Sequence, residues 1–209
     1  MWNTRPNHRI SPSTRRQRDV ALFFQLPDLN VHVWISAFAT KPNDFDSVLR
    51  QLHEEYPDVS VQFVDLDNVP GSRYLLLAIL NALKSHRSKQ PISRTLSMEI
   101  LLYVSASRQI AEAIRFVGVS SNTKRIAVLT VGKTEEELSG IAAGLDRRLN
   151  QANNDALVDV WSTARIEKVL ALFDIGSKEL RASLRRNESR PQAIERLAIE
   201  RSALLTVRR

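Results

Sequence analysis

The stretch from Tyr74 to Leu83 most constrains the fold, because nine of its ten residues are apolar and Asn81 is the single exception. At the helical period these apolar positions lie all round the axis, so a helix here has no polar face. The rest of the chain must therefore cover it on nearly all sides. We expect this segment to form the central helix of the protein.

Two more apolar helices are expected close behind it, over Leu96–Val104 and Ser107–Val117. Three such helices within 45 residues exceed what one face of a small sheet can hide. We expect them to form a compact helical layer and also to leave apolar surface for a protein partner. The residues expected to contact that partner are Leu102, Ile110, Ala113, Ile114 and Val117.

Short apolar or alternating runs between turn residues predict the strands of a small sheet. They are Val20–Phe24, Val31–Ile35, Val59–Val64 and Arg125–Val131. Helices are expected after a cap at Asn43 or Asp44, over Glu135–Leu149, Thr163–Phe173 and Ser177–Leu184, and from Pro191 onward. The sequence therefore predicts an α+β fold, in which a small antiparallel or mixed sheet packs against several helices in a single domain.

The length of 209 residues fits one domain, residues 19–209, behind a basic arm. Residues 1–18 combine five Arg with Pro, Asn, Ser and Thr and lack apolar periodicity, so we expect a disordered arm there. The chain contains no cysteine, and no apolar stretch approaches the roughly 20 residues that span a bilayer. We expect a cytoplasmic protein that contacts no membrane.

The net charge of +7 is concentrated in three segments. Residues 1–18, 84–94 and 176–209 carry net charges of +5, +4 and +5, which leaves −7 on the rest of the chain. Clustered positive charge of this kind indicates a polyanionic partner, and we expect RNA.

The segment from 84 to 94 is the best candidate for binding RNA, because it joins two apolar helices and carries no acid. Its cations can neutralise phosphates, and Ile92 offers apolar surface to an unstacked base, which is how single-stranded RNA is usually held. The candidate RNA-binding residues are Arg73, Lys84, His86, Arg87, Lys89, Ile92, Arg94 and Arg108.

Catalytic and metal-binding motifs are missing from the sequence. The four histidines lie far apart, and Gly132-Lys133-Thr134 lacks the first glycine of a phosphate-binding loop, since Ala127 stands in its place. Thr134 and Glu137 instead fit a capping box that starts a helix. We expect no catalytic residue, no metal and no small-molecule cofactor.

One enzymatic alternative remains, in which Asp65, Asp67 and Glu99 surround a cleft that the sequence does not reveal. The simpler interpretation is that Asp67 or Asn68 caps the helix that follows and that Glu99 is an ordinary helix residue.

Three ordered runs of sequence carry a family resemblance. They are Val64-Asp65-Leu66-Asp67-Asn68-Val69-Pro70-Gly71 leading into Tyr74-Leu75-Leu76-Leu77-Ala78, then Arg94–Tyr103, then Ser107–Ile114 with Phe116–Val119. Together they resemble the kinase-binding (TPRKB-like) small subunits of the KEOPS (EKC) complex over about residues 31–131. The run from Ile194 to Leu205 looks like the archaeal form of that family, and the arm 1–18 departs from the pattern.

The resemblance implies a non-catalytic subunit with an α+β fold. Members of the family bind the small kinase-like ATPase of the complex, which transfers threonylcarbamoyl to the adenosine beside the tRNA anticodon. Archaeal relatives also hold the single-stranded CCA end of tRNA. An adaptor for that ATPase and tRNA is therefore expected, and the alternative is a stand-alone RNA-binding module without a kinase partner.

Overall fold

The computed structural model describes residues 22–39, 44–88 and 91–203, so the expected basic arm 1–18 lies outside the described part. The α+β class is confirmed. The sheet has four antiparallel strands in the order β1-β2-β4-β3, with bounds Leu22–Leu26, Val31–Ala39, Arg125–Gly132 and Ser60–Asp65 in that order.

Eight helices accompany the sheet in the described residues. They are α1 (Phe45–Glu55), α2 (Ser72–Arg87), α3 (Leu96–Ser105), α4 (Ile110–Val117), α5 (Glu135–Arg148), α6 (Thr163–Leu172), α7 (Ser177–Ser183) and α8 (Arg190–Ala203). The longest is α2, with 16 residues. None of the helices described is long and apolar enough to cross a membrane.

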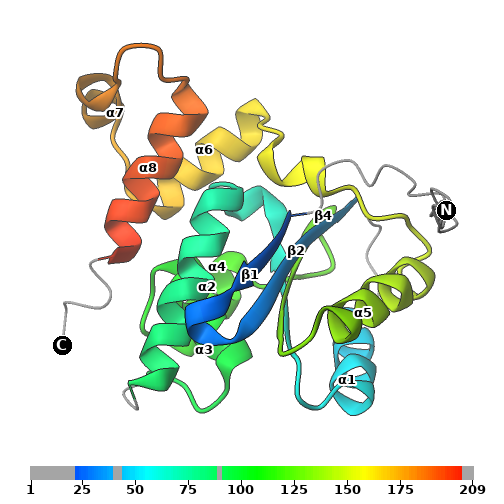
Figure 1. Cartoon of the computed structure of the whole chain (residues 1–209). Helices are drawn as coiled ribbons and strands as arrows, with labels where there is room; N and C mark the ends of the chain where they lie inside the picture. Colours follow the sequence, from blue (N-terminus) through cyan, green and yellow to red (C-terminus); the bar gives the residue numbers. More distant parts are fainter. Residues whose placement is uncertain (1–21, 40–43, 89–90, 204–209) are drawn as a thin grey trace, which may run out of the picture.

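Each strand sends alternate side chains to opposite faces of the sheet, and this alternation divides the apolar core in two. On β2, Val33 and Ile35 join the core beneath α2 and α3, whereas Trp34 and Phe38 join the core beneath α1 and α5. Figure 1 shows α1 and α5 together on one side of the sheet and α2, α3 and α4 on the other. The protein therefore has three layers, with the sheet in the middle.

Side-chain caps explain where several helices begin. Asp44 accepts a hydrogen bond from the Ser47 amide at 3.0 Å and starts α1, as its sequence predicts. Thr134 and Glu137 form both hydrogen bonds of the predicted capping box at the start of α5. The segment Gly132-Lys133-Thr134 is thus the end of a strand and a helix cap.

The N-terminus of α2 is held by two acids far away in the sequence. Asp159 accepts hydrogen bonds from the amide and hydroxyl of Ser72 at 2.9 and 2.7 Å, and Glu195 of α8 accepts one from the Tyr74 amide at 3.0 Å. Gly71 permits this approach: its φ is 145°, and a Cβ there would lie 2.7 Å from Glu195 Oε1. Carboxylates at this end also complement the helix dipole.

The expected cap of α2 at Asp67 or Asn68 is wrong. Asp67 instead forms an ion pair with Arg125 of β4, and the side-chain amide of Asn68 donates to the carbonyl of Phe116 at 2.9 Å. Both residues tie the connection between β3 and α2 to neighbouring elements, so their side chains are turned away from the helix start.

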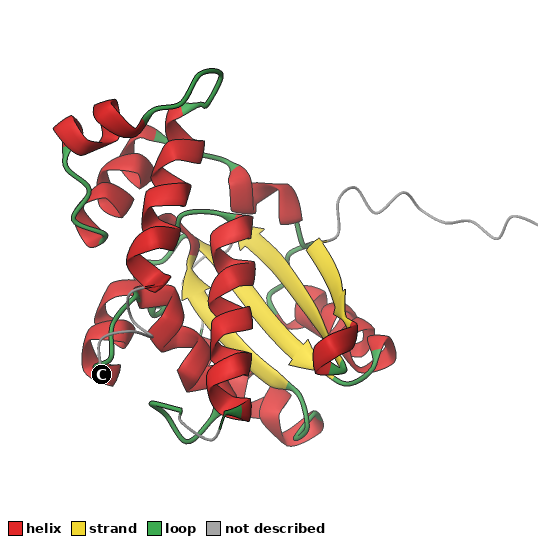
Figure 2. Ribbon diagram, turned by 60° about the vertical axis from the view of Figure 1, so that its left-hand side comes forward, coloured by secondary structure: helices red, strands yellow, loops and turns green. Residues whose placement is uncertain are grey.

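Arg165 of α6 fixes the same region from inside the core. Its side chain is fully buried and donates hydrogen bonds to the carbonyls of Val69, Val158 and Val160 at 2.7 to 3.1 Å. Its guanidinium also lies 4.9 Å from the ring centroid of Trp161. Burial lowers its pKa to about 10, which still leaves it charged at neutral pH. The C-terminal helices are thus bonded to the chain just ahead of α2 (Figure 2).

We predict a pH dependence of stability from Asp155, a buried residue whose Oδ1 has no hydrogen-bond partner among the described residues. Burial raises its pKa from 3.8 to about 6, although the amides of Ala37 and Leu22 partly oppose this. The folded protein then binds more protons than the unfolded chain between about pH 4 and 6, so stability falls as pH rises through that window. The group stabilises the fold below that range and no longer does so above it.

Urea unfolding of the wild type and of Asp155→Asn at pH 4 and 6.5 isolates this effect. The free energy of unfolding of the wild type, taken relative to the variant, should fall by about 1–3 kcal/mol between the two values. A difference that stays constant or rises with pH would show that folding does not raise the pKa of Asp155.

Candidate functional site

The basic linker (residues 84–94) lies where α2 ends and α3 begins. Lys84 and Arg94 are exposed and Ile92 is half-buried. Residues 89 and 90 lie outside the described residues, and with them the predicted contact Lys89. The remaining part of the linker presents the cations and apolar surface that a single-stranded RNA requires.

Glu99 of α3 determines the shape of the basic linker. Its fully buried carboxylate accepts hydrogen bonds from the amides of Ile92 and Ser93 at 3.2 and 2.7 Å. Thr95 then caps α3 by accepting from the Met98 amide at 3.3 Å. The backbone at Ile92 and Ser93 is therefore held in place, which reduces the entropy lost when a ligand binds there.

Arg87 forms hydrogen bonds to a distant turn, which the local sequence does not reveal. Its Nη1 and Nη2 atoms donate to the carbonyls of Asp28 and Leu29 at 3.0 and 2.7 Å, which binds the end of α2 to the turn between β1 and β2. His86 is half-buried, and its Nε2 atom has no partner among the described residues. These two residues are thus less available to RNA than Lys84 and Arg94.

Arg73 and Arg108 do not join the basic linker. Arg73 lies in the first turn of α2, and 14 residues of helix place it about 21 Å from Arg87. Arg108 follows the C-terminal end of α3, whereas the linker precedes its N-terminal end. The structure therefore divides the predicted RNA-binding residues between the two ends of the α2–α3 pair.

The predicted partner-binding residues separate into two groups. Ile110 and Ile114 of α4 are 44% and 50% exposed and form an apolar stripe on the surface. Leu102, Ala113 and Val117 are fully buried and pack inside the protein, so their expected contact with a partner needs correction. The apolar positions of α4 that the sequence singles out include one flank that packs on α3 and one flank that faces solvent. Helical periodicity alone does not distinguish the two flanks.

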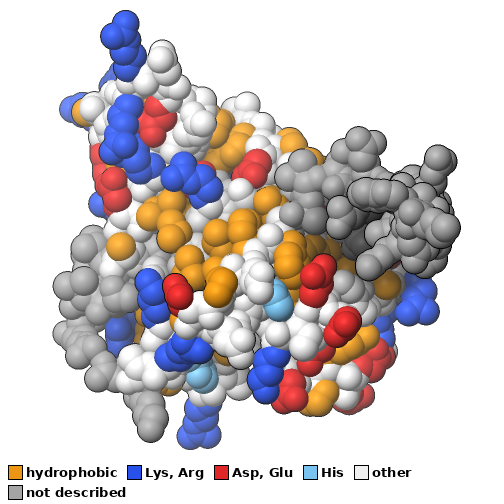
Figure 3. All heavy atoms as spheres, in the orientation of Figure 1, with side chains coloured by type: hydrophobic (Ala, Val, Ile, Leu, Met, Phe, Trp, Pro, Cys, Tyr) orange, Lys and Arg blue, Asp and Glu red, His pale blue; other side chains and the backbone are white. Residues whose placement is uncertain are grey.

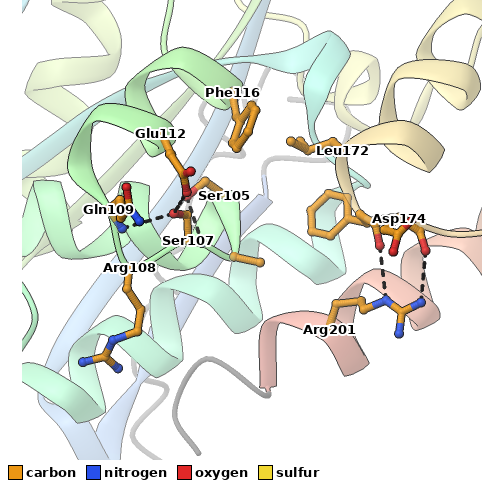
Figure 4. A pocket seen from close by; sticks show the side chains of 11 residues that line it. Ser105, Ser107, Arg108, Gln109, Glu112, Phe116, Leu172, Asp174 and Arg201 are labelled. Carbon is orange, nitrogen blue, oxygen red and sulfur yellow. Dashed lines mark hydrogen bonds between the residues drawn. The ribbon is translucent and has the colours of Figure 1, made fainter. Parts of the chain in front are cut away.

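A cleft of about 480 Å³ lies between the α3–α4 connection and the C-terminal helices. Figure 4 shows Phe116 and Leu172 in its wall, with Ser107 bonded to Glu112 at 2.8 Å on one side and Arg201 bonded to the carbonyls of Phe173 and Asp174 on the other. Sequence reasoning missed this cleft, because its lining comes from residues 105–109, 112, 116, 172–174 and 201. No local motif joins such distant segments.

The cleft and the exposed isoleucines lie on different flanks of α4. Successive residues of a helix are turned by about 100°, so Phe116, which lines the cleft, lies about 160° round the axis from Ile114. The buried positions lie between them. The apolar stripe is therefore a separate surface and does not extend into the cleft.

The three carboxylates of the enzymatic alternative are not gathered around one cleft. Asp65 accepts from the Asp67 amide at 2.9 Å and from the Thr123 hydroxyl at 3.0 Å, and burial raises its pKa. Asp67 is paired with Arg125, and Glu99 is bonded to the basic linker. In the described residues no three His, Cys, Asp or Glu side chains lie close enough to hold a metal ion.

An α+β domain with a cationic linker at one end of its central helices and an exposed apolar stripe on a neighbouring helix has the surface features of a macromolecular binding module. Comparison with known proteins gives the family. Residues 43–206 match the family model described as "Kinase binding protein CGI-121". Because this match covers well over half of the chain, the protein belongs to the kinase-binding CGI-121 family.

The relatives are proteins of fungi. A protein of Aspergillus fumigatus named EKC/KEOPS complex subunit cgi121 is 24% identical over 156 residues, which cover 72% of this chain and 81% of the fungal protein. Proteins with the same name from Schizosaccharomyces pombe and Yarrowia lipolytica are 26% and 22% identical, and each match covers 53% of this chain. Those matches span 63% and 65% of the two proteins, just under two thirds.

The resemblance to the kinase-binding KEOPS subunits is thus confirmed by the family match and the names of the relatives. The expected likeness to the archaeal form of the family stays a prediction, since these relatives are fungal.

We predict that Glu99→Ala destabilises the fold and loosens the basic linker. The substitution leaves two amides without an acceptor beside a cavity, which should cost about 2–4 kcal/mol. Hydrogen exchange of the Ile92 and Ser93 amides should become faster than in the wild type. The control Glu136→Ala, at an exposed position of α5, should change the stability by less than about 0.5 kcal/mol. Unchanged exchange at Ile92 and Ser93 would show that Glu99 does not hold the linker.

Proposed function

We propose that this protein is a non-catalytic subunit of a KEOPS-type complex. It binds and supports the kinase-like ATPase of the complex and holds the single-stranded 3′ CCA end of tRNA, so that threonylcarbamoyladenosine is formed on the tRNA in the cytoplasm. The family, described as kinase-binding, and the relatives, named as subunits of that complex, support the protein partner.

The RNA half of the proposal depends mainly on the C-terminal part of the basic linker, where the amides of Ile92 and Ser93 are held by Glu99. Lys84 and Arg94 are exposed, and Glu99 holds the backbone at Ile92 and Ser93, next to Arg94. Two separated cations suit consecutive phosphates, and the apolar side chain suits the face of an unstacked base. A prearranged site of this kind favours a short single strand over a duplex, whose bases are stacked away from the surface.

The protein half of the proposal depends on the apolar stripe of α4. Ile110 and Ile114 are about half exposed although they belong to a strongly amphipathic helix, and the described residues do not cover them. Apolar side chains of this exposure next to each other are typical of interface cores. Arg115 of the same helix is exposed as well and would lie at the polar rim of the interface.

We predict that removal of the CCA end of a tRNA weakens its binding to this protein. Fluorescence anisotropy with intact and trimmed tRNA should give at least about a tenfold difference in Kd. The double variant Lys84→Glu/Arg94→Glu should lose this preference for intact tRNA. Its slope of log K against log salt concentration should be about 1.4 units shallower than that of the wild type. Arg147→Glu, at an exposed position of α5, serves as the control. Equal affinity for both tRNAs would contradict the assigned CCA site.

We predict that Ile110→Ser/Ile114→Ser abolishes co-purification with the kinase-like ATPase. The free energy of unfolding of the variant should stay within about 1 kcal/mol of that of the wild type. Truncation of central apolar contacts typically weakens an interface by tenfold or more. Val160→Ser, which changes a side chain of similar exposure near α6, is the matched control.

Two results would contradict the partner proposal. Full co-purification of the double variant would show that the ATPase binds elsewhere. Failure of the wild type to bind the ATPase, with tRNA binding intact, would favour the stand-alone RNA-binding module.

A further inference from the structure

The α7 hairpin (residues 177–190), which consists of α7 and the loop leading into α8, carries positive charge that the basic linker does not account for. It projects from the layered body of the protein, and Figure 3 shows Lys and Arg side chains gathered on this projection at the upper left. Five exposed cations belong to it: Lys178, Arg181, Arg185, Arg186 and Arg190.

The two acids of the α7 hairpin are both paired with arginines of α8. Glu179 accepts two hydrogen bonds from Arg201, both of 3.0 Å, and Glu188 accepts two from Arg196, also of 3.0 Å. Arg196 holds the pKa of Glu188 down at about 2. Within the described part of the chain, none of the five exposed cations has a carboxylate within 4.0 Å.

A tight turn fixes the tip of the hairpin. The amide of Arg185 donates to Glu188 Oε2, and the amide of Glu188 donates to the carbonyl of Arg185, both at 3.1 Å. Asn187 between them has a φ of 66°, a left-handed conformation that asparagine tolerates better than most residues. Arg186 is therefore presented at the tip by a backbone that is already ordered.

Helix stability does not explain where these cations lie. Lys178 is the second residue of α7 and Arg190 is the first of α8, so both stand at the positive end of a helix dipole. A cation is unfavourable at that end. Their positions are better explained by attraction to a negatively charged partner.

The composition of the hairpin identifies the partner class as nucleic-acid backbone. Residues 177–190 contain no aromatic residue, and their one exposed large apolar side chain is Leu184, so neither base stacking nor an apolar interface core is available. Arg, Ser and Asn are side chains that contact phosphates. We propose that the α7 hairpin binds the phosphate backbone of double-stranded RNA, independently of sequence. The proposal adds to the RNA binding proposed above and depends on it.

The α7 hairpin and the basic linker lie at opposite ends of α2, whose 16 residues span about 24 Å (Figures 1 and 2). An RNA with a single-stranded 3′ end and an adjoining duplex can therefore contact both surfaces. The single strand lies on the linker, where Ile92 is available, and the duplex lies on the hairpin, where the exposed side chains are mainly cations and small polar groups.

The test measures the affinity of the full-length chain for an RNA hairpin of about 12 base pairs without any overhang. Arg185→Gln/Arg186→Gln removes two exposed cations that form no ion pair within 4.0 Å in the described part of the chain. We expect its Kd to rise about tenfold at low salt and the slope of log K against log salt to become about 1.8 units shallower. Lys133→Gln/Arg147→Gln, two exposed cations near α5, should leave both values unchanged.

Unchanged affinity and slope in the Arg185/Arg186 variant would overturn the proposal. An acidic surface of a partner protein would then be the expected ligand of the hairpin. The overhang-free RNA keeps this test separate from that of the basic linker, since Lys84→Glu/Arg94→Glu should not alter its binding. A second probe with a single-stranded 3′ tail should lose affinity in both variants. If only the linker variant weakens the tailed probe, the CCA site is retained and the hairpin site is rejected.

Discussion

The position of α2 depends on the two carboxylates that accept hydrogen bonds at its N-terminus. Asp159 and Glu195 belong to the C-terminal third of the chain, and they reach the backbone of Ser72 and Tyr74 because Gly71 has no side chain in the way. The buried side chain of Arg165 stabilises the same region through hydrogen bonds to three carbonyls. An apolar helix has no polar face of its own to orient it, so these bonds determine how it lies in the core.

Both proposed binding surfaces follow from that arrangement. With its N-terminus held by α8 and its flanks packed against the sheet and α3, α2 presents its C-terminal end and the basic linker to solvent. Glu99 then directs the chain into α3, and α4 packs against α3 with two isoleucines outward. The surface for RNA and the surface for a protein partner therefore belong to one packed group of helices yet do not overlap.

Local sequence was sufficient for most of the fold. Short apolar or alternating runs predicted β2, β3 and β4, and a cap at Asn43 or Asp44 and one at Thr134 predicted two helix starts, because each signal depends on neighbouring residues. The cap of α2 could not be predicted, since Glu195 lies 121 residues from Tyr74. The same limit applies to Arg87, whose carbonyl partners lie 58 and 59 residues away, and to the cleft beside α4.

The functional surfaces were predicted less completely than the core. The apolar stripe of α4 predicted a partner surface on this helix, but tertiary packing decides that Ala113 is buried and Ile114 is exposed. Charge clustering in the last 34 residues was visible in the sequence, whereas the pairing of Glu179 and Glu188 with arginines of α8 was not. Composition thus indicates which kind of partner to expect. The ion pairs of the folded protein then show which of the described cations are left to contact that partner.

The central claim is that one small protein holds a kinase-like ATPase and an RNA at the same time on separate surfaces. Sedimentation velocity of the chain with its ATPase and a labelled tRNA tests this most directly. The account predicts that all three sediment together, and that the ATPase changes the affinity of this chain for the CCA end by less than about threefold. Displacement of one ligand by the other would contradict it, because the two would then share a single surface.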